Sequence, residues 1–336
     1  MITEEIASHV FPDNPPPFAP APWARNPHLQ SIFASLRLRA LGKNEMVENA
    51  GDIILDGGNG VRLLAFHSTQ RLKNPKALVL LIHGWEGSSD STYILHTGRY
   101  LYRRGCDIVR LNLRDHGDSH HLNEGLFNGT LIDETATAVG NAAGLAPDLP
   151  FFIVGFSLGG NFALRLALSR NGMPISGLKH VVCVSPLIDP YRSTVLIDRL
   201  PVYRYYFLRK WKRSLRRKQE LFPALYRFDD LLHINNTMEL TERLISCYTE
   251  FEGCRDYFNR YTLGAGTFHD LATPVTLIAA EDDPVIPADD VRAIGGNSLL
   301  RLLIQRWGGH CGFLDPFPFG CWYEELISEI IEQAVE

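Results

Sequence analysis

From Ala77 onward, short apolar runs alternate with longer amphipathic stretches, and this alternation strongly constrains the fold. Each apolar run has the length of a strand buried on both faces, and each intervening stretch has the length of a helix. Parallel strands joined by helical crossovers are expected, in one sheet with helices on both faces. The expected strands span 77–82, 107–112, 151–155, 180–185, 275–280 and 299–305, and the expected helices span 91–104, 130–146, 158–171 and 320–335.

Two parts of the chain break this rhythm. Residues 11–27 hold seven prolines, which predicts an extended, non-helical arm; two strand-like runs follow, joined by the turn-rich DGGNG at 56–60. The long interval before the strand at 275–280 is mostly helical in pattern and too long for a plain loop, so we expect an inserted cap. The expected organisation is an arm over 1–45, a core over 46–185 and 272–336, and a helical cap over 186–271.

Bulk composition disfavours several classes of protein. With 336 residues, 45% of them apolar, and a net charge of −5, the chain is globular in composition and gives no reason to expect nucleic-acid binding. Glu4 and Glu5 argue against a secretory signal, and the apolar runs are too short to span a bilayer. Six scattered cysteines without a C-x-x-C pair favour a reduced, cytoplasmic protein. The oligomeric state stays open.

The most informative motif lies in FFIVGFSLGGNFALRLAL, residues 151–168. A buried strand leads into Gly155-Phe156-Ser157-Leu158-Gly159 and then into an amphipathic helix, which is the setting that gives G-x-S-x-G its meaning. The sharp turn needs glycines around the serine, and it lifts the hydroxyl to a helix N-terminus. The motif alone can arise by chance, but the flanking strand and helix favour Ser157 as a nucleophile.

A serine hydroxyl becomes a nucleophile only with a base and an oxyanion site. The base candidate is His310 in WGGHCGFLD (307–315), because it follows the last strand and its neighbouring glycines let the loop reach over the sheet edge. His83, at the end of an earlier strand, is interpreted as structural. The backbone N–H groups of Trp85 and Leu158 are the expected oxyanion donors.

An orienting carboxylate is expected after the strand that precedes the last one, where the chain reads EDDP at 281–284. Asp282 and Asp283 are both candidates, and either gives the chain order Ser, Asp, His that accompanies this kind of elbow. Assigning one acid to the site removes the need for a metal to explain the acidic cluster. His120 and His121 are adjacent, and sequence neighbours rarely chelate one ion, so no metal site is expected.

At these motifs the sequence resembles the α/β-hydrolase superfamily and, within it, the YheT-like group (the AB hydrolase 4 family). The resemblance covers almost the whole chain and implies the α/β-hydrolase fold. It also implies that Asp283, four residues before Pro287, is the acid of the triad. The segments that carry it are NPHLQSIFAS (26–35), HGWEGSSDSTYI (83–94), NLRDHGDS (112–119), GFSLGGN (155–161), AEDDPVIP (280–287) and GGHCGF (308–313).

The resemblance implies a serine hydrolase of the carboxylesterase or lipase type, which cleaves carboxylic esters or lipid acyl chains without a cofactor. An alcohol O-acyltransferase using the same triad is the first alternative, and product analysis in ethanol–water mixtures would distinguish the two. A non-catalytic, hydrolase-like binding protein is the second alternative. Candidates at every triad and oxyanion position argue against it.

The segment YYFLRKWKRSLRRKQELF (205–222) predicts a basic amphipathic helix in the cap, since seven of the ten residues from 209 to 218 are Lys or Arg. Its apolar face is expected to pack on the core. Its basic face is either simply solvated or makes peripheral contact with an anionic membrane surface.

Overall fold

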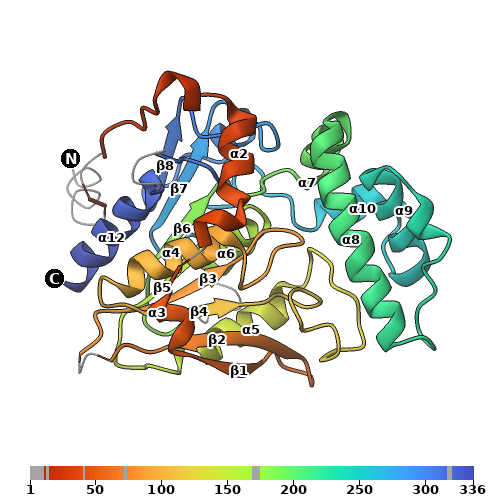
Figure 1. Ribbon diagram of the computed structural model, residues 1–336, viewed down its shortest axis with the longest axis horizontal. Helices are drawn as coiled ribbons and strands as arrows, with labels where there is room; N and C mark the ends of the chain where they lie inside the picture. The colour runs from red at the N-terminus through yellow and green to blue at the C-terminus, as the bar shows by residue number, and fades with distance from the viewer. Residues whose placement is uncertain (1–10, 13–14, 41, 72–73, 169–174, 316–319) are drawn as a thin grey trace.

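An eight-stranded sheet forms the centre of the molecule, with the strand order β1-β2-β4-β3-β5-β6-β7-β8 (Figure 1). β1 and β2 form an antiparallel hairpin and β2 pairs antiparallel with β4, whereas every other neighbouring pair is parallel. The mostly parallel α/β sheet is therefore confirmed. The strands are β1 Ala50–Asp56, β2 Arg62–Ser68, β3 Leu78–Ile82, β4 Asp107–Leu111, β5 Phe151–Phe156, β6 Leu178–Val184, β7 Val275–Ala280 and β8 Leu300–Gln305.

These coordinates come from a computed structural model, which describes residues 11–336 apart from 13–14, 41, 72–73, 169–174 and 316–319. The first ten residues of the expected arm, with Glu4 and Glu5, lie outside the described residues. So do the last three residues of the helix expected over 158–171.

Helices cover both faces of the sheet, as the alternation of apolar runs predicts. Alternate side chains of β3 enter different cores: Leu78 and Leu80 pack with α5 and α6, whereas Val79 and Leu81 pack with α4 and α12. A strand buried on both faces must be apolar throughout, which is why ALVLLI shows no polar alternation. The helices are α4 Thr92–Tyr102, α5 Ile132–Ala143, α6 Leu158–Ala167, α11 Ala288–Arg292 and α12 Trp322–Val335.

Four helices lie between β6 and β7, in the interval where a cap was expected. They gather beside the sheet at the right of Figure 1. Helices α8 and α9 share a small apolar core that includes Leu208, Leu215 and Phe228, whereas α7 and α10 pack on the main core through Ile197 and Phe258. The cap boundaries at 186 and 271 remain a prediction. The helices are α7 Pro190–Arg199, α8 Pro201–Leu221, α9 Thr237–Tyr248 and α10 Cys254–Asn259, with a 3-10 turn, η3, at Leu231–His233.

The N-terminal segment corrects one expectation. Residues 11–27 are not wholly non-helical, because Pro22–Ala24 form a 3-10 turn, η1. Proline suits a first turn, since its fixed φ is helical and its missing N–H would have no partner there. The segment is tied to the far end of the chain, where the Phe18 N–H donates to Gln305 Oε1 at 2.8 Å. Three more short elements follow: α2 Pro27–Ser35, η2 Arg37–Ala40 and α3 Glu45–Glu48.

Candidate active site

Ser157 stands at the turn between β5 and α6, where its backbone adopts φ 52° and ψ −115°. A non-glycine residue in such a conformation is strained by about 1–3 kcal/mol, and packing on both sides must hold it. A Cβ on Gly155 would come within 2.3 Å of the Gly159 carbonyl oxygen, and a Cβ on Gly159 within 2.3 Å of the Ile82 carbonyl oxygen. These close approaches explain why the turn needs glycine at both positions.

Two polar side chains from separate loops complete a hydrogen-bonded chain with Ser157. His310 Nε2 lies 3.0 Å from Ser157 Oγ, and His310 Nδ1 lies 2.9 Å from Asp283 Oδ2. His310 follows β8 and Asp283 follows β7, so all three residues lie beyond the carboxyl ends of parallel strands. Because a carboxylate only accepts, Nδ1 of the neutral imidazole carries the proton and Nε2 accepts from the serine hydroxyl.

The surroundings of this chain favour a positive charge on the imidazole. Burial alone lowers the pKa of His310, but the Asp283 carboxylate outweighs burial and holds that pKa well above its ordinary value of 6.5. The Asp283 side chain is only 2% exposed, so water screens this attraction poorly. Its other oxygen, Oδ1, accepts from the N–H groups of Val285 and Ile286 at 2.8 and 2.9 Å, which fixes the orientation of the carboxylate.

The three consecutive acids after β7 have three different partners. Glu281 forms an exposed ion pair with Arg292 at 2.7 Å. Asp282 Oδ1 accepts from the Gly309 N–H at 2.9 Å, in the loop that carries the histidine. Asp283 alone contacts the imidazole. Of the two aspartates that the motif order leaves open, Asp283 therefore lies against the base candidate, and Asp282 holds its loop.

The expected oxyanion donors lie beside the serine. Leu158 opens α6 directly after Ser157, and a Cβ on Gly84, the neighbour of Trp85, would lie 3.1 Å from the Ser157 Cβ. Within the part of the chain that the structure describes, the N–H groups of Trp85 and Leu158 donate to no acceptor. Free N–H groups near a helix N-terminus can stabilise a carbonyl oxygen that becomes negative.

The histidines interpreted as non-catalytic have other surroundings. His83 is buried; its Nδ1 donates to the carbonyl of the next residue at 2.8 Å, and its Nε2 accepts from the Leu113 N–H at 3.2 Å. Burial lowers the pKa of His83 to about 4, so the ring is neutral and holds the loop after β3. His120 is buried and bonds Ser214 at 2.8 Å, whereas its neighbour His121 is exposed. These two rings therefore face different surroundings.

Helix α2 supports the histidine loop, a role that the sequence motifs did not predict. Ser31 Oγ accepts from the His310 N–H at 2.8 Å. Gln30 exchanges two hydrogen bonds with Leu314: its Oε1 accepts from the Leu314 N–H at 2.7 Å, and its Nε2 donates to the Leu314 carbonyl at 3.2 Å. The available signal was the Gln-Ser pair inside the helical segment NPHLQSIFAS, because a buried polar pair must find partners.

Helix α8 brings aromatic side chains over the segment that carries the expected oxyanion donor. Phe207 stacks on Trp85 with ring centroids 5.0 Å apart, and Trp211 meets the same indole edge-on at 5.1 Å. One turn before Phe207, the Tyr203 hydroxyl lies 3.1 Å from His28 Nδ1 of α2. Helices α2 and α8 therefore meet through His28 and Tyr203, and α8 packs two aromatic rings on Trp85.

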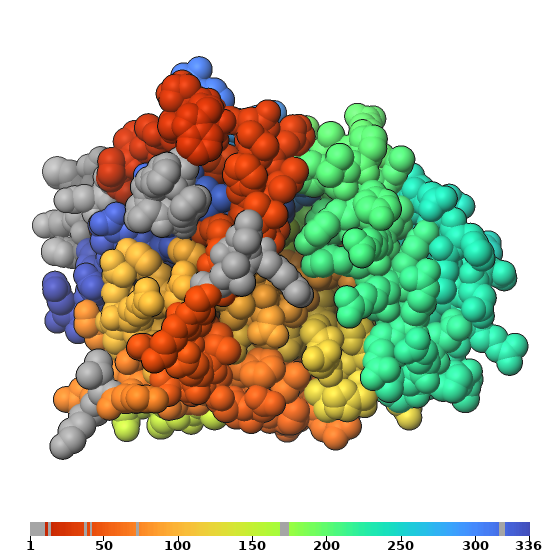
Figure 2. Space-filling model, viewed as in Figure 1, coloured from red at the N-terminus to blue at the C-terminus, as the bar shows by residue number. Residues whose placement is uncertain are grey.

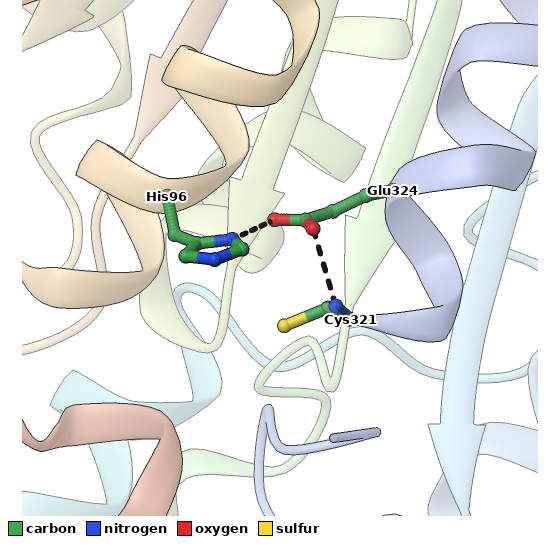
Figure 3. A group of neighbouring side chains, drawn as sticks. All are labelled: His96, Cys321 and Glu324. Carbon is green, nitrogen blue, oxygen red and sulfur yellow. Dashed lines mark hydrogen bonds and ion pairs between the residues drawn. The ribbon is translucent and has the colours of Figure 1, made fainter. Parts of the chain in front are cut away.

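A second group of side chains has ligand types that suit a metal. His96 from α4 points toward Glu324 in the first turn of α12, with Cys321 beside it (Figure 3). One ligand atom from each lies within 4.8 Å of the other two. However, Glu324 Oε1 accepts from His96 at 2.7 Å and Oε2 from the Cys321 N–H at 3.1 Å. The Arg39 guanidinium donates to the sulfur at 3.0 Å, and burial raises the pKa of the Cys321 thiol to about 12.

This arrangement fits a helix cap better than a metal centre. The carboxylate is already occupied, the thiol is neutral, and a cation stands where a metal ion would add positive charge. The group instead caps α12 and joins it to α4.

Comparison with known proteins identifies the family to which the chain belongs. A model of the alpha/beta hydrolase family matches residues 79–319. Since this is more than half of the sequence, the chain belongs to the α/β-hydrolase family. Among the described residues, none of the helices is both long enough and apolar enough to cross a bilayer.

Individual relatives are distant but extensive. An abhydrolase domain-containing protein of Dictyostelium discoideum is 22% identical over 331 residues, which is 95% of this chain and 80% of that protein. The phospholipase ABHD3 of Bos taurus is 22% identical over 308 residues, 88% of this chain and 71% of that protein. These relatives confirm the resemblance to the AB hydrolase 4 family. The Pyrococcus furiosus esterase Pf2001 shares the fold, with a TM-score of 0.57 at 16% identity, covering 85% of this chain and 91% of its own.

Proposed function

We propose that this protein is a serine hydrolase that cleaves carboxylic esters through Ser157, His310 and Asp283. The observation that carries the proposal is the unbroken chain of contacts from Ser157 Oγ through the His310 ring to Asp283 Oδ2, at 3.0 and 2.9 Å. His310 Nε2 supplies an acceptor for the Ser157 hydroxyl proton, and Asp283 supplies a negative charge beside the imidazole. The strained elbow presents the hydroxyl beside two free N–H groups.

The reaction proceeds in two halves. Ser157 Oγ attacks the ester carbonyl while His310 Nε2 takes its proton, and the N–H groups of Trp85 and Leu158 bind the oxyanion. The tetrahedral intermediate collapses, the C–O bond to the alcohol breaks, and the imidazolium gives its proton to the leaving alkoxide. Water then repeats the attack on the acyl-enzyme with His310 as base, which releases the acid and restores the serine hydroxyl. Asp283 stabilises the imidazolium in both halves.

The substrate class is proposed to be carboxylic esters with an apolar acyl part, lipid esters included. The aromatic surface of Trp85, Phe207 and Trp211 next to the expected oxyanion site supports an apolar acyl group. The names of two relatives, a phospholipase and an esterase, agree with ester chemistry.

Replacement of the proposed nucleophile tests this function. Ser157→Ala should abolish hydrolysis of p-nitrophenyl esters and covalent labelling by a fluorophosphonate probe, because both need the Oγ atom. Ser246→Ala is the matched control, since Ser246 is exposed on α9 and its hydroxyl donates to the Glu242 carbonyl at 2.8 Å. Full labelling of the Ser157→Ala protein would overturn the assignment. A p-nitrophenyl ester series of increasing acyl length would then define the preferred chain.

A further inference from the structure

A basic groove runs along helix α8, and the residues that line it are distinct from those of the proposed active site. It has a volume of about 500 Å³. Four cationic side chains line it, together with Tyr205 and Leu208, and no acidic side chain does. The cations are Arg204, Arg209, Lys212 and Arg216.

The cations of α8 fall into two sets, which the sequence pattern did not separate. Lys218 is buried and bonds Asp115 Oδ1 and the Asn123 carbonyl, both at 2.7 Å. Lys210 donates to the Glu86 carbonyl at 2.8 Å. These two lysines hold α8 to the core. The groove cations point away from the core and into the groove, so they do not hold α8 to the core.

The groove cations lack acidic partners. In the part of the chain that the structure describes, Arg209 and Arg216 form no ion pair. The Lys212 ammonium contacts the Asn235 amide oxygen at 3.2 Å. Arg204, Lys212 and Arg216 recur at helical spacings of eight and four residues, so their charges share one side of the helix. Like charges in such a row repel, and an anion in the groove would relieve that repulsion.

Exposed apolar side chains gather at the start of α8 and on the N-terminal segment that contains α2. Eight of the thirteen large apolar side chains that are exposed in the described residues belong to segments 23–36 and 202–206. Val202 and Tyr205 are 66% and 67% exposed, at the N-terminal end of the groove. α2 and the α7–α8 segment adjoin on the face shown in Figure 2, where red and green atoms meet, and His28 and Tyr203 join them. Single exposed apolar residues are common, but a cluster marks an interaction surface.

We propose that this surface binds an anionic lipid bilayer, with lipid phosphates in the groove and the exposed aromatic and aliphatic residues in the interface. A phosphate fits a groove lined by guanidinium groups and an ammonium. The apolar neighbours favour a bilayer as the source of that phosphate, because a soluble polyanion would leave them in water. The proposal goes beyond the proposed ester hydrolysis and holds independently of it.

Vesicle flotation with matched charge variants tests the proposal. The full chain is mixed with vesicles of phosphatidylcholine alone, or of phosphatidylcholine and phosphatidylglycerol in equal amounts. The groove variant is Arg209→Gln/Lys212→Gln/Arg216→Gln. The control variant is Lys179→Gln/Arg227→Gln/Arg243→Gln, which removes the same charge from exposed positions outside the groove. Thermal unfolding of each variant verifies that it is folded.

The wild-type protein and the control should float with the anionic vesicles and stay behind with the neutral ones. The groove variant should lose roughly a hundredfold in vesicle partitioning, since each cation near an anionic surface contributes about fivefold. Added salt should weaken wild-type binding. Three results would overturn the proposal: equal binding to neutral vesicles, unchanged binding by the groove variant, or binding of soluble inositol hexakisphosphate without any vesicle binding.

Discussion

The two neighbouring aspartates after β7 allow a sharp test of the proposed triad. Asp283→Asn and Asp282→Asn are the same chemical change at adjacent positions, and both remove one negative charge beside the same loop. Their expected effects differ, because Asp283 contacts the His310 imidazole and Asp282 contacts the Gly309 backbone.

The Asp283→Asn change should invert the hydrogen-bonding roles of the imidazole. Oδ1 of Asp283 accepts from two backbone N–H groups, at Val285 and Ile286, so an asparagine must keep its oxygen at that position. Its amide NH2 group then faces His310 Nδ1, which becomes the acceptor and leaves the proton on Nε2. A protonated Nε2 cannot take the proton of Ser157. Such an inverted tautomer costs roughly 10⁴-fold in kcat, or about 5 kcal/mol of transition-state stabilisation.

The Asp282→Asn change should be mild. The asparagine oxygen can still accept from the Gly309 N–H, as Asp282 Oδ1 does at 2.9 Å. Oδ2, which the amide NH2 would replace, is buried without a hydrogen-bond partner in the described part of the chain. The loop therefore keeps its anchor, and we expect at most about a tenfold loss in kcat, the equivalent of one weakened hydrogen bond.

The assay is hydrolysis of a p-nitrophenyl ester as a function of pH, with thermal unfolding as the check on folding. In the wild-type protein the acid limb of kcat/KM should lie above 6.5, because Asp283 raises the pKa of His310 and activity needs the neutral ring. Asp283→Asn should move that limb to lower pH, since burial without the carboxylate lowers the pKa. A loss in Asp282→Asn as large as that in Asp283→Asn would refute the assignment.

Two further changes probe the anchoring of α8 and the electrostatics beneath it. Lys218→Met should lower the free energy of unfolding, measured in urea, by about 3–5 kcal/mol, because it strands the buried carboxylate of Asp115. Adding Asp115→Asn should restore at least half of that loss, and a double variant no more stable than Lys218→Met would contradict the reasoning. Burial raises the pKa of Glu86 from 4.5 to about 8, so the unfolded chain loses this proton first and stability falls as pH rises between these values. Glu86→Gln should therefore be more stable than wild type by about 3 kcal/mol at pH 7 and indistinguishable from it below pH 4.5, and a constant difference across pH would argue against this cause.

The parts of this molecule that the sequence predicts well are those governed by local pattern. A short, wholly apolar run such as ALVLLI predicts a strand that is buried on both faces. G-x-S-x-G predicts a tight turn, because at Gly155 and Gly159 the folded chain leaves no room for a Cβ. Chain order then places the base candidate after β8 and the acid after β7, so His310 and the acidic triplet could be found without coordinates.

The contacts that the sequence does not predict depend on tertiary distances. The sequence EDDP does not predict that Asp282 contacts Gly309 and Asp283 contacts the imidazole, because two adjacent aspartates differ only in the direction of their side chains. The support from Ser31 is equally hidden, because α2 and the histidine loop are almost 280 residues apart in sequence and meet only when the arm folds over the sheet.

Helix α8 shows why a count of charges does not describe a surface. Seven cations in ten residues suggest one uniformly basic face, yet Lys210 and Lys218 turn inward to backbone carbonyls of the core, and Lys218 also to Asp115. A long lysine side chain can bury its stem and place its ammonium on a distant acceptor, so its direction depends on what lies beneath the helix. The cations left outside, beside Val202 and Tyr205, do not reach the core: Lys212 contacts Asn235 of the cap, and Arg209 and Arg216 form no ion pair among the described residues. It is this remainder, and not the total charge of the helix, that argues for a phosphate-bearing surface.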